Sequence, residues 1–138
     1  MKISTKGRYA LRLMLEIAMG DAGRPVRIKE IAKKQDISEK YLEQIVSVLN
    51  KSGMVRSIRG PQGGYLLARR PDEYTVGDIL RTTEGSLEPV ECVSSSLEAC
   101  PRVEDCATNI VWRRLSDAIN EVVDGITLSD LEDWQLAK

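Results

Sequence analysis

Apolar and polar positions between residues 27 and 68 follow a pattern that predicts two helices and then a hairpin. The apolar positions of the second helix recur at the i, i+3, i+4, i+7 spacing of one helix face, and they are Leu42, Ile45, Val46 and Leu49. Ser38 is its expected N-cap, because a serine hydroxyl accepts a hydrogen bond from a free amide of the first turn. Gly53 is expected to end this helix in the left-handed conformation. A shorter helix, from about Ile28 to Lys34, precedes it.

A two-stranded hairpin is predicted directly after these helices. Its strands cover residues 55–59 and 65–68, and the glycine-rich stretch 60–64 forms the turn. This order is typical of a winged helix-turn-helix, in which the second helix enters the major groove and the hairpin lies along the backbone or minor groove of DNA. A small helix–hairpin core with a solvated face, or a protein-docking module, has the same pattern. The polar side chains must therefore distinguish DNA binding from these alternatives.

Four further helices are predicted from periodicity and capping residues. They cover about Lys6 to Met19, Val76 to Thr83, Thr108 to Asp124 and Leu128 to Leu136. The third of these has apolar positions spaced 4, 3 and 4 apart, a seam typical of helix pairing, formed by Val111, Leu115, Ala118 and Val122. Ile119, Val123 and Ile126 widen that seam. We therefore expect this helix to form a homodimer interface.

The predicted fold is mostly α-helical with a small β-hairpin wing. A winged helix-turn-helix DNA-binding domain is expected in residues 1–84. A cysteine-bearing loop, expected to bind a metal cluster as argued below, covers residues 85–107. A dimerisation helix and a short C-terminal helix follow in residues 108–138.

Charge divides the chain into a basic and an acidic half. Residues 1–70 hold 15 Lys and Arg against 6 Asp and Glu, whereas residues 71–138 hold 5 against 15. The basic half contains the predicted helix-turn-helix, as expected if that end meets a polyanion. The longest apolar runs are too short for a membrane span or signal peptide, so we expect a cytoplasmic protein. Without histidine, a phosphate loop or a convincing nucleophile–base pair, we expect no enzyme activity.

The candidates for contact with double-stranded DNA lie on the exposed face of the second helix, on the wing and near the start of the chain. Arg56 and Arg59 flank a wing tip whose glycines are small enough to approach phosphates closely. We expect Arg59 to lie in or beside the minor groove, and Glu43 to accept a hydrogen bond from cytosine N4. An intrahelical pair with Lys40 or with Ser47 is the alternative for Glu43. The full set is Lys6, Arg8, Ser38, Lys40, Tyr41, Glu43, Gln44, Arg56, Arg59, Gly60, Gly63 and Gly64.

All three cysteines lie within 15 residues, in the spacing C-x7-C-x5-C of Cys92, Cys100 and Cys106. Residues 88–105 lack periodicity, and an unstructured loop of that length in a compact domain usually serves a function. Thiolates are soft ligands that suit zinc or an iron–sulfur cluster, whereas three idle thiols are the alternative. An odd number of cysteines in a reducing compartment argues against a disulfide framework.

Four motifs carry a resemblance to a known family: Ser4-Thr5-Lys6-Gly7-Arg8-Tyr9-Ala10, Tyr41-Leu42-Glu43-Gln44, Arg59-Gly60-Pro61-Gln62-Gly63-Gly64-Tyr65 and Ile126-Thr127-Leu128. They resemble IscR-type iron–sulfur cluster regulators over nearly the whole chain. The resemblance implies a homodimeric winged-helix transcription regulator that holds a 2Fe–2S cluster and controls cluster-assembly genes. It also links Glu43 to restricting the sites that the cluster-free form binds.

The resemblance implies three cysteine ligands, which match Cys92, Cys100 and Cys106, and one histidine. Asn109 stands where that histidine is expected, three residues after the last cysteine, and a neutral amide is a poor iron ligand. The candidates for a fourth ligand are carboxylates: Glu91, Glu98, Glu104, Asp105 or Glu16 of the partner subunit.

The leading hypothesis is a transcription regulator that binds a two-fold operator as a homodimer and responds to a labile 2Fe–2S cluster. Iron–sulfur cluster assembly proteins are further partners that the resemblance suggests. One alternative is a related regulator of cysteine and sulfur metabolism that acts through a protein partner. Another is a nitric-oxide-responsive relative with a 4Fe–4S cluster.

Overall fold

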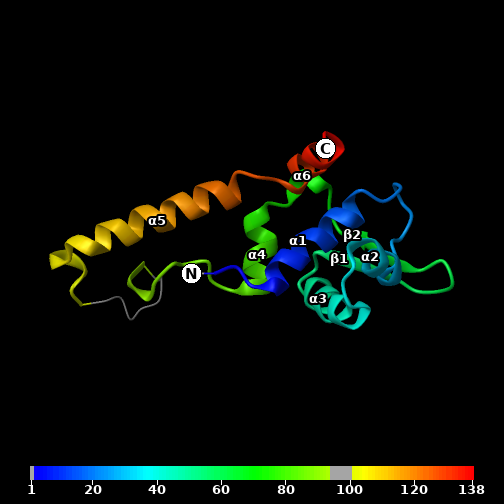
Figure 1. Cartoon of the computed structure of the whole chain (residues 1–138), viewed down its shortest axis with the longest axis horizontal. Helices are drawn as coiled ribbons and strands as arrows, with labels where there is room; N and C mark the ends of the chain where they lie inside the picture. The colour runs from blue at the N-terminus through cyan, green and yellow to red at the C-terminus, as the bar shows by residue number, and fades with distance from the viewer. Residues whose placement is uncertain (1, 94–100) are drawn as a thin grey trace.

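The computed structural model describes residues 2–93 and 101–138. Within them the chain is mostly helical, with one antiparallel hairpin, which confirms the predicted winged-helix architecture. Figure 1 shows a compact winged half at one end of the molecule and a single long helix that extends away from it. The elements are α1 (Thr5–Ala18), α2 (Ile28–Gln35), α3 (Glu39–Lys51), β1 (Val55–Ile58), β2 (Gly64–Leu67), α4 (Val76–Glu84), α5 (Ala107–Asp124) and α6 (Leu128–Leu136).

Three short 3-10 turns complete the described chain: η1 (Pro71–Glu73), η2 (Glu91–Val93) and η3 (Val103–Asp105). The last two fall within residues 88–105, which the sequence predicted to be wholly irregular, so that prediction was wrong for six residues. None of the helices in the two described stretches is both long and apolar enough to cross a membrane.

Local capping chemistry sets the helix starts. The hydroxyls of Ser38, Thr75 and Thr127 each accept a hydrogen bond from an amide in the first turn of the helix that follows. Thr75 and Thr127 form full capping boxes, because the carboxylate three residues on accepts a bond from the cap's own amide. Gly53, at φ 75°, ends α3 in the left-handed region, as the sequence predicted.

The core of the winged half is formed by the apolar faces of α1, α2, α3, α4 and α6. Its fully buried members include Leu13, Met14, Ile31, Leu42, Ile45, Leu49, Ile79 and Leu128. Tyr74 joins this core to the wing: its buried hydroxyl donates to the Met54 carbonyl at 2.5 Å and accepts from the amides of Ala68 and Arg69 at 3.1 Å each. The base of the hairpin is therefore fixed to the segment that directly follows α3.

The wing is extended by a residue from an earlier part of the chain. Strand β1 pairs with β2 from Val55 opposite Leu67 to Ile58 opposite Gly64. On the outer edge of β2, Val26 exchanges two main-chain hydrogen bonds with Tyr65, at 2.9 and 2.8 Å. Gly64 adopts φ 154°, and a Cβ there would lie 2.5 Å from the Val26 carbonyl oxygen. Only glycine fits this approach without strain.

Helix α5 is an arm with little support from its own chain. Asn109 is the one buried residue described in its 18 residues. Its inner side packs Ile119 and Val123, with Ile126 just beyond, on Val76, Leu80 and Leu87. These three residues, which the sequence predicted to widen a dimer seam, are thus partly buried against their own subunit. Beside this packed side, four large apolar residues of α5 stay exposed: Ile110, Val111, Leu115 and Val122.

Candidate nucleic-acid interface and cysteine site

The exposed face of α3 presents the polar residues that the sequence predicted for a recognition helix. Lys40, Glu43 and Gln44 are all exposed, and the Ser38 hydroxyl accepts a hydrogen bond from the Tyr41 amide at 3.3 Å. No ion pair joins Glu43 to Lys40, although both side chains belong to the described part of the chain. The Glu43 carboxylate is therefore available to a ligand outside the protein.

Tyr41 differs from its neighbours because it is only half exposed. Its ring meets the ring of Tyr9 from α1 edge to face, with centroids 5.8 Å apart, and the Arg12 guanidinium lies 5.7 Å from the Tyr9 centroid. Such pairs are mutually attractive. Tyr41 therefore helps set the angle between α3 and α1, a role that the sequence motif alone did not indicate.

The wing places Arg56 and Arg59 on its exposed surface, on either side of Ile58. Gly60 is also exposed, with φ 108°, and forms the outer part of the tip. Gly63 is buried, and a side chain there would collide with the Ile58 carbonyl. Hairpin closure thus accounts for Gly63, as the approach of Val26 accounts for Gly64. Among the three predicted glycines, only Gly60 faces outward.

The start of α1 brings two basic side chains beside an acidic cap. Lys6 is half exposed and Arg8 is exposed. The Glu84 carboxylate, from the end of α4, accepts hydrogen bonds from the Ser4 amide and the Gly7 amide, each at 3.0 Å, and from the Ser4 hydroxyl. These helix N-terminal amides are therefore already bonded, so a phosphate would have to be met by the Lys6 and Arg8 side chains.

Two of the three cysteines lie in the described residues, and both are half-exposed free thiols. Cys92 lies in η2, and Cys106 directly precedes α5; Cys100 falls outside the described residues. The Cys106 Sγ lies 3.1 Å from the Thr108 hydroxyl. That hydrogen bond, with the nearby main-chain amide of Asn109, lowers the pKa of the Cys106 thiol below its usual value of 9.0. The surroundings thus favour the thiolate, the form that binds metal.

Asn109 connects the two cysteines. Its side-chain Nδ2 donates to the Cys92 carbonyl oxygen at 3.2 Å, and its main-chain amide donates to the Cys106 carbonyl oxygen at 3.2 Å. The side chain is 4% exposed. The first turn of α5 therefore holds the main chain at both cysteine positions.

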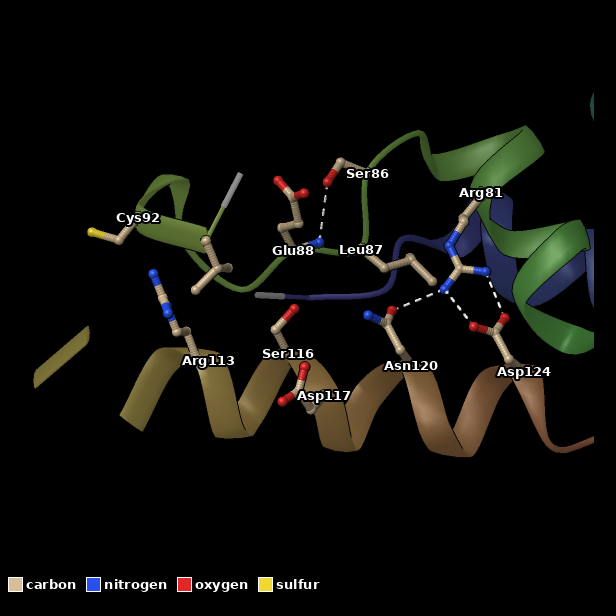
Figure 2. A pocket seen from close by; sticks show the side chains of 11 residues that line it. Arg81, Ser86, Leu87, Glu88, Cys92, Arg113, Ser116, Asp117, Asn120 and Asp124 are labelled. Atoms are coloured by element: carbon tan, nitrogen blue, oxygen red, sulfur yellow. Dashed lines mark hydrogen bonds and ion pairs between the residues drawn. The ribbon is translucent and has the colours of Figure 1, made fainter. Parts of the chain in front are cut away.

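An open groove with a volume of about 770 Å³ runs between residues 86–93 and α5. Figure 2 shows Arg113 directed from α5 toward the η2 turn at one end of it. At the other end Arg81 of α4 makes two bonds to the Asp124 carboxylate, at 2.6 and 3.1 Å, and a third to the Asn120 side-chain oxygen at 2.9 Å. These bonds raise the pKa of Arg81 and lower that of Asp124, so both stay charged. We call this contact the α4–α5 clamp.

The candidate carboxylate ligands differ in how available they are. Glu91, Glu104 and Asp105 are exposed, while Glu98 lies outside the described residues. The Glu16 carboxylate pairs with Lys34 at 3.0 Å and accepts a bond from Gln35 at 2.7 Å within its own subunit. This pairing disfavours Glu16 as a ligand.

The donor set fits a thiophilic metal centre as far as it is described. The free thiol of Cys106 directly precedes α5, the carbonyl of Cys92 is bonded to the first turn of the same helix, and the chemistry of cysteine suits iron–sulfur clusters and zinc. No group of three metal-ligating side chains forms within residues 2–93 and 101–138, a range that leaves out Cys100.

Comparison with known proteins identifies relatives over almost the entire chain. The Rrf2 family model, described as an iron-dependent transcriptional regulator, matches residues 3–133. The transcriptional regulator CymR of Bacillus subtilis is 46% identical over 134 residues, which cover 97% of this chain and 91% of CymR. The transcriptional regulator IscR of Erwinia tasmaniensis is 40% identical over 135 residues, which cover 98% of this chain and 81% of that protein.

The solved structure of CymR, the global cysteine regulator of B. subtilis, superposes with a TM-score of 0.82 at 44% identity, covering 97% of this chain and 98% of that one. The likeness to IscR-type regulators that the sequence motifs indicated is thus confirmed. Regulators of this family bind DNA, in agreement with the exposed polar face of α3 and the arginines of the wing. The chain belongs to the Rrf2 family of winged-helix transcription regulators.

Proposed function

We propose that this protein is a homodimeric regulator of iron–sulfur cluster biogenesis genes whose DNA binding is gated by a labile 2Fe–2S cluster on Cys92, Cys100 and Cys106. The observation that carries the proposal is the placement of Cys92 and Cys106 at the start of α5, the helix that also bears the exposed apolar face. The family description as iron-dependent regulators and the identity to IscR support it.

On DNA, α3 would enter the major groove with Lys40, Glu43 and Gln44 facing the base edges and phosphates. The wing would place Arg59 in or beside the minor groove, and the exposed Gly60 would let the tip approach the backbone. Further phosphate contacts would come from Lys6, Arg8 and Arg56, all of which are at least partly exposed.

The dimer would form through α5. Contiguous exposed apolar residues on a soluble protein usually mark an interaction surface, and Ile110, Val111, Leu115 and Val122 provide one along a single helix. A two-fold pairing of α5 would hold two recognition helices about one DNA turn apart, roughly 34 Å, as a palindromic operator requires.

The route from the cysteines to DNA would run through α5 and α4. The α4–α5 clamp fixes one end of α5, and Glu84 at the end of α4 caps the start of α1. A shift of α5 would therefore reach the basic start of α1 through a single helix. When bound, a 2Fe–2S cluster would crosslink the cysteines, and its presence would depend on oxygen and on the supply of iron and sulfide. A carboxylate as fourth ligand would make it labile, because carboxylate oxygen is a poor match for iron–sulfur chemistry.

A second candidate function is regulation of cysteine metabolism through a protein partner. The 46% identity to CymR, whose structure is described as that of a global cysteine regulator, favours it. Under that function the exposed groove and thiols would have no metal role, and DNA binding would be indifferent to iron and sulfide.

Anaerobic reconstitution with iron and sulfide separates the two candidates. Wild-type protein should develop the visible charge-transfer bands of a 2Fe–2S centre, with two irons per subunit, and each single Cys→Ala variant should lose them. Wild-type protein that takes up zinc but never shows these bands would contradict the cluster and favour the second candidate.

A further inference from the structure

We propose that Asn109 is a positioning residue for the cysteine site: it fixes Cys92 relative to Cys106 through hydrogen bonds and is not itself a metal ligand. This inference deepens the proposed function and rests on it for the role of the cysteines as ligands.

The burial of Asn109 is unusual for its helix. The side chain is 4% exposed, whereas Ile110, the next residue, is 57% exposed and no other described residue of α5 is buried. Removing an amide from water is unfavourable unless its hydrogen bonds are replaced. Helix α5 leaves large aliphatic residues exposed but buries Asn109. The amide of Asn109 must therefore make a specific contact.

The contact joins two distant parts of the chain. The Asn109 Nδ2 bond to the Cys92 carbonyl, at 3.2 Å, spans 17 residues. The main-chain amide of the same residue bonds the Cys106 carbonyl, also at 3.2 Å. One residue thus holds the main chain at both cysteines before any ligand binds. Closing a loop has an entropic cost, and a site that is closed before its ligand arrives binds that ligand more tightly.

The orientation of the amide argues against ligation. A carbonyl oxygen can only accept, so the edge of the Asn109 amide that faces Cys92 must be its NH2 group, which has no lone pair to offer a metal. The remaining amide oxygen is a hard donor and a poor match for a thiophilic centre. Hydrogen bonding to Cys92 thus takes the place of metal ligation at this position.

Alkylation of individual thiols in the full-length, metal-free, reduced protein tests the positioning role directly. Reaction with iodoacetamide, followed by peptide mass spectrometry, gives a rate for each cysteine. We expect Asn109→Ala to raise the Cys92 rate about fivefold, the factor that one lost hydrogen bond gives. The similarly sized Asn109→Leu should do the same, because its side chain has no group that can donate to the Cys92 carbonyl oxygen and it adds no charge that would alter the thiol pKa.

Two controls keep the result specific. Asn120→Ala removes an amide from the same helix that bonds Arg81 instead, and it should leave the Cys92 rate unchanged. Cys106 should also react at an unchanged rate in Asn109→Ala, because the main-chain bond to its carbonyl is retained. Equal acceleration at Cys92 and Cys106 would show general loosening and overturn the inference, as would unchanged Cys92 reactivity in both Asn109 variants.

Reconstitution of the same variants tests ligation. Asn109→Ala should give the same visible band positions and the same electron paramagnetic resonance g-values as the wild type, but lose its cluster several times faster. Shifted bands or g-values would identify Asn109 as a ligand and overturn the inference. Faster Cys92 alkylation in a protein whose wild type forms no cluster would overturn the proposed function and leave the positioning role standing.

Discussion

The winged half and the α5 arm are built from similar amphipathic helices with opposite outcomes. In α3, Leu42, Ile45 and Leu49 are completely buried by the helices of the same chain. In α5, Leu115 is 40% and Ile110 57% exposed, and the one buried residue is the polar Asn109. The winged half therefore supports its own fold, whereas the arm presents an apolar surface and a cysteine site. The two regions therefore obtain their stability from different sources.

The same substitution in both regions should give the largest contrast. Leu49→Ala removes a fully buried side chain and should cost about 2–5 kcal/mol of unfolding free energy. Leu115→Ala, on the exposed side of α5, should cost the isolated subunit less than about 1 kcal/mol. Urea denaturation of both variants at low protein concentration measures the two values; similar losses would contradict the division into a self-supporting half and an arm.

The charged variant Leu115→Glu separates pairing from folding. A carboxylate in an apolar helix seam is strongly disfavoured, so the dimer should dissociate while the winged half stays folded. Sedimentation equilibrium should show a monomer with an unchanged helical circular dichroism signal. An intact dimer in this variant would remove α5 from the interface.

On the DNA-reading side, Arg59→Ala should weaken operator binding by roughly 1–3 kcal/mol if Arg59 reads a narrow minor groove. Arg24→Ala is the matched control, because Arg24 is an exposed arginine outside the wing, paired with Asp21. Fluorescence anisotropy at physiological salt compares the two. Equal affinity of Arg59→Ala and the wild type would place Arg59 in solvent.

A smaller change in affinity, with a larger change in selectivity, is expected from Glu43→Ala. The carboxylate is exposed and not paired with Lys40, and next to phosphates it should repel sequences that offer it no hydrogen-bond donor. Selection from random duplexes should therefore recover a broader set of sites for the variant. A uniform gain in affinity without broader selectivity would reduce Glu43 to an electrostatic role.

The smallest effect is expected at the α4–α5 clamp, which connects the two regions. Arg81 holds the pKa of Asp124 below its usual value of 3.8, so the ion pair stabilises the fold above that pH and is lost as the pH falls through the folded pKa. Because the pair is exposed, Asp124→Asn should cost under about 1 kcal/mol near neutral pH. The difference between variant and wild type should vanish in acid. A difference that grows in acid would contradict this assignment.

Local signals predicted most of the winged half, because caps and helix faces depend on neighbouring residues. Ser38 caps the helix that the sequence assigned to it, and Thr75 and Thr127 cap the predicted helices that follow them. Periodicity alone could not separate Ile119 and Val123, which pack on their own chain, from Leu115, which does not. The burial of Asn109 arises from a contact with Cys92, 17 residues away, and no local pattern indicates it. Glycines 63 and 64 were likewise explained by contacts within the wing and not by the approach of DNA.

The central claim is that the state of the cysteine site on α5 changes DNA binding by the winged half. Anaerobic fluorescence anisotropy with one operator duplex, obtained by selection on the reconstituted protein, tests it most directly. Loaded wild type, cluster-free wild type and Cys92→Ala are compared at one salt concentration. We predict that the loaded protein differs in Kd from the other two by about 5- to 150-fold, the range of typical allosteric coupling. The same Kd for all three would contradict the account.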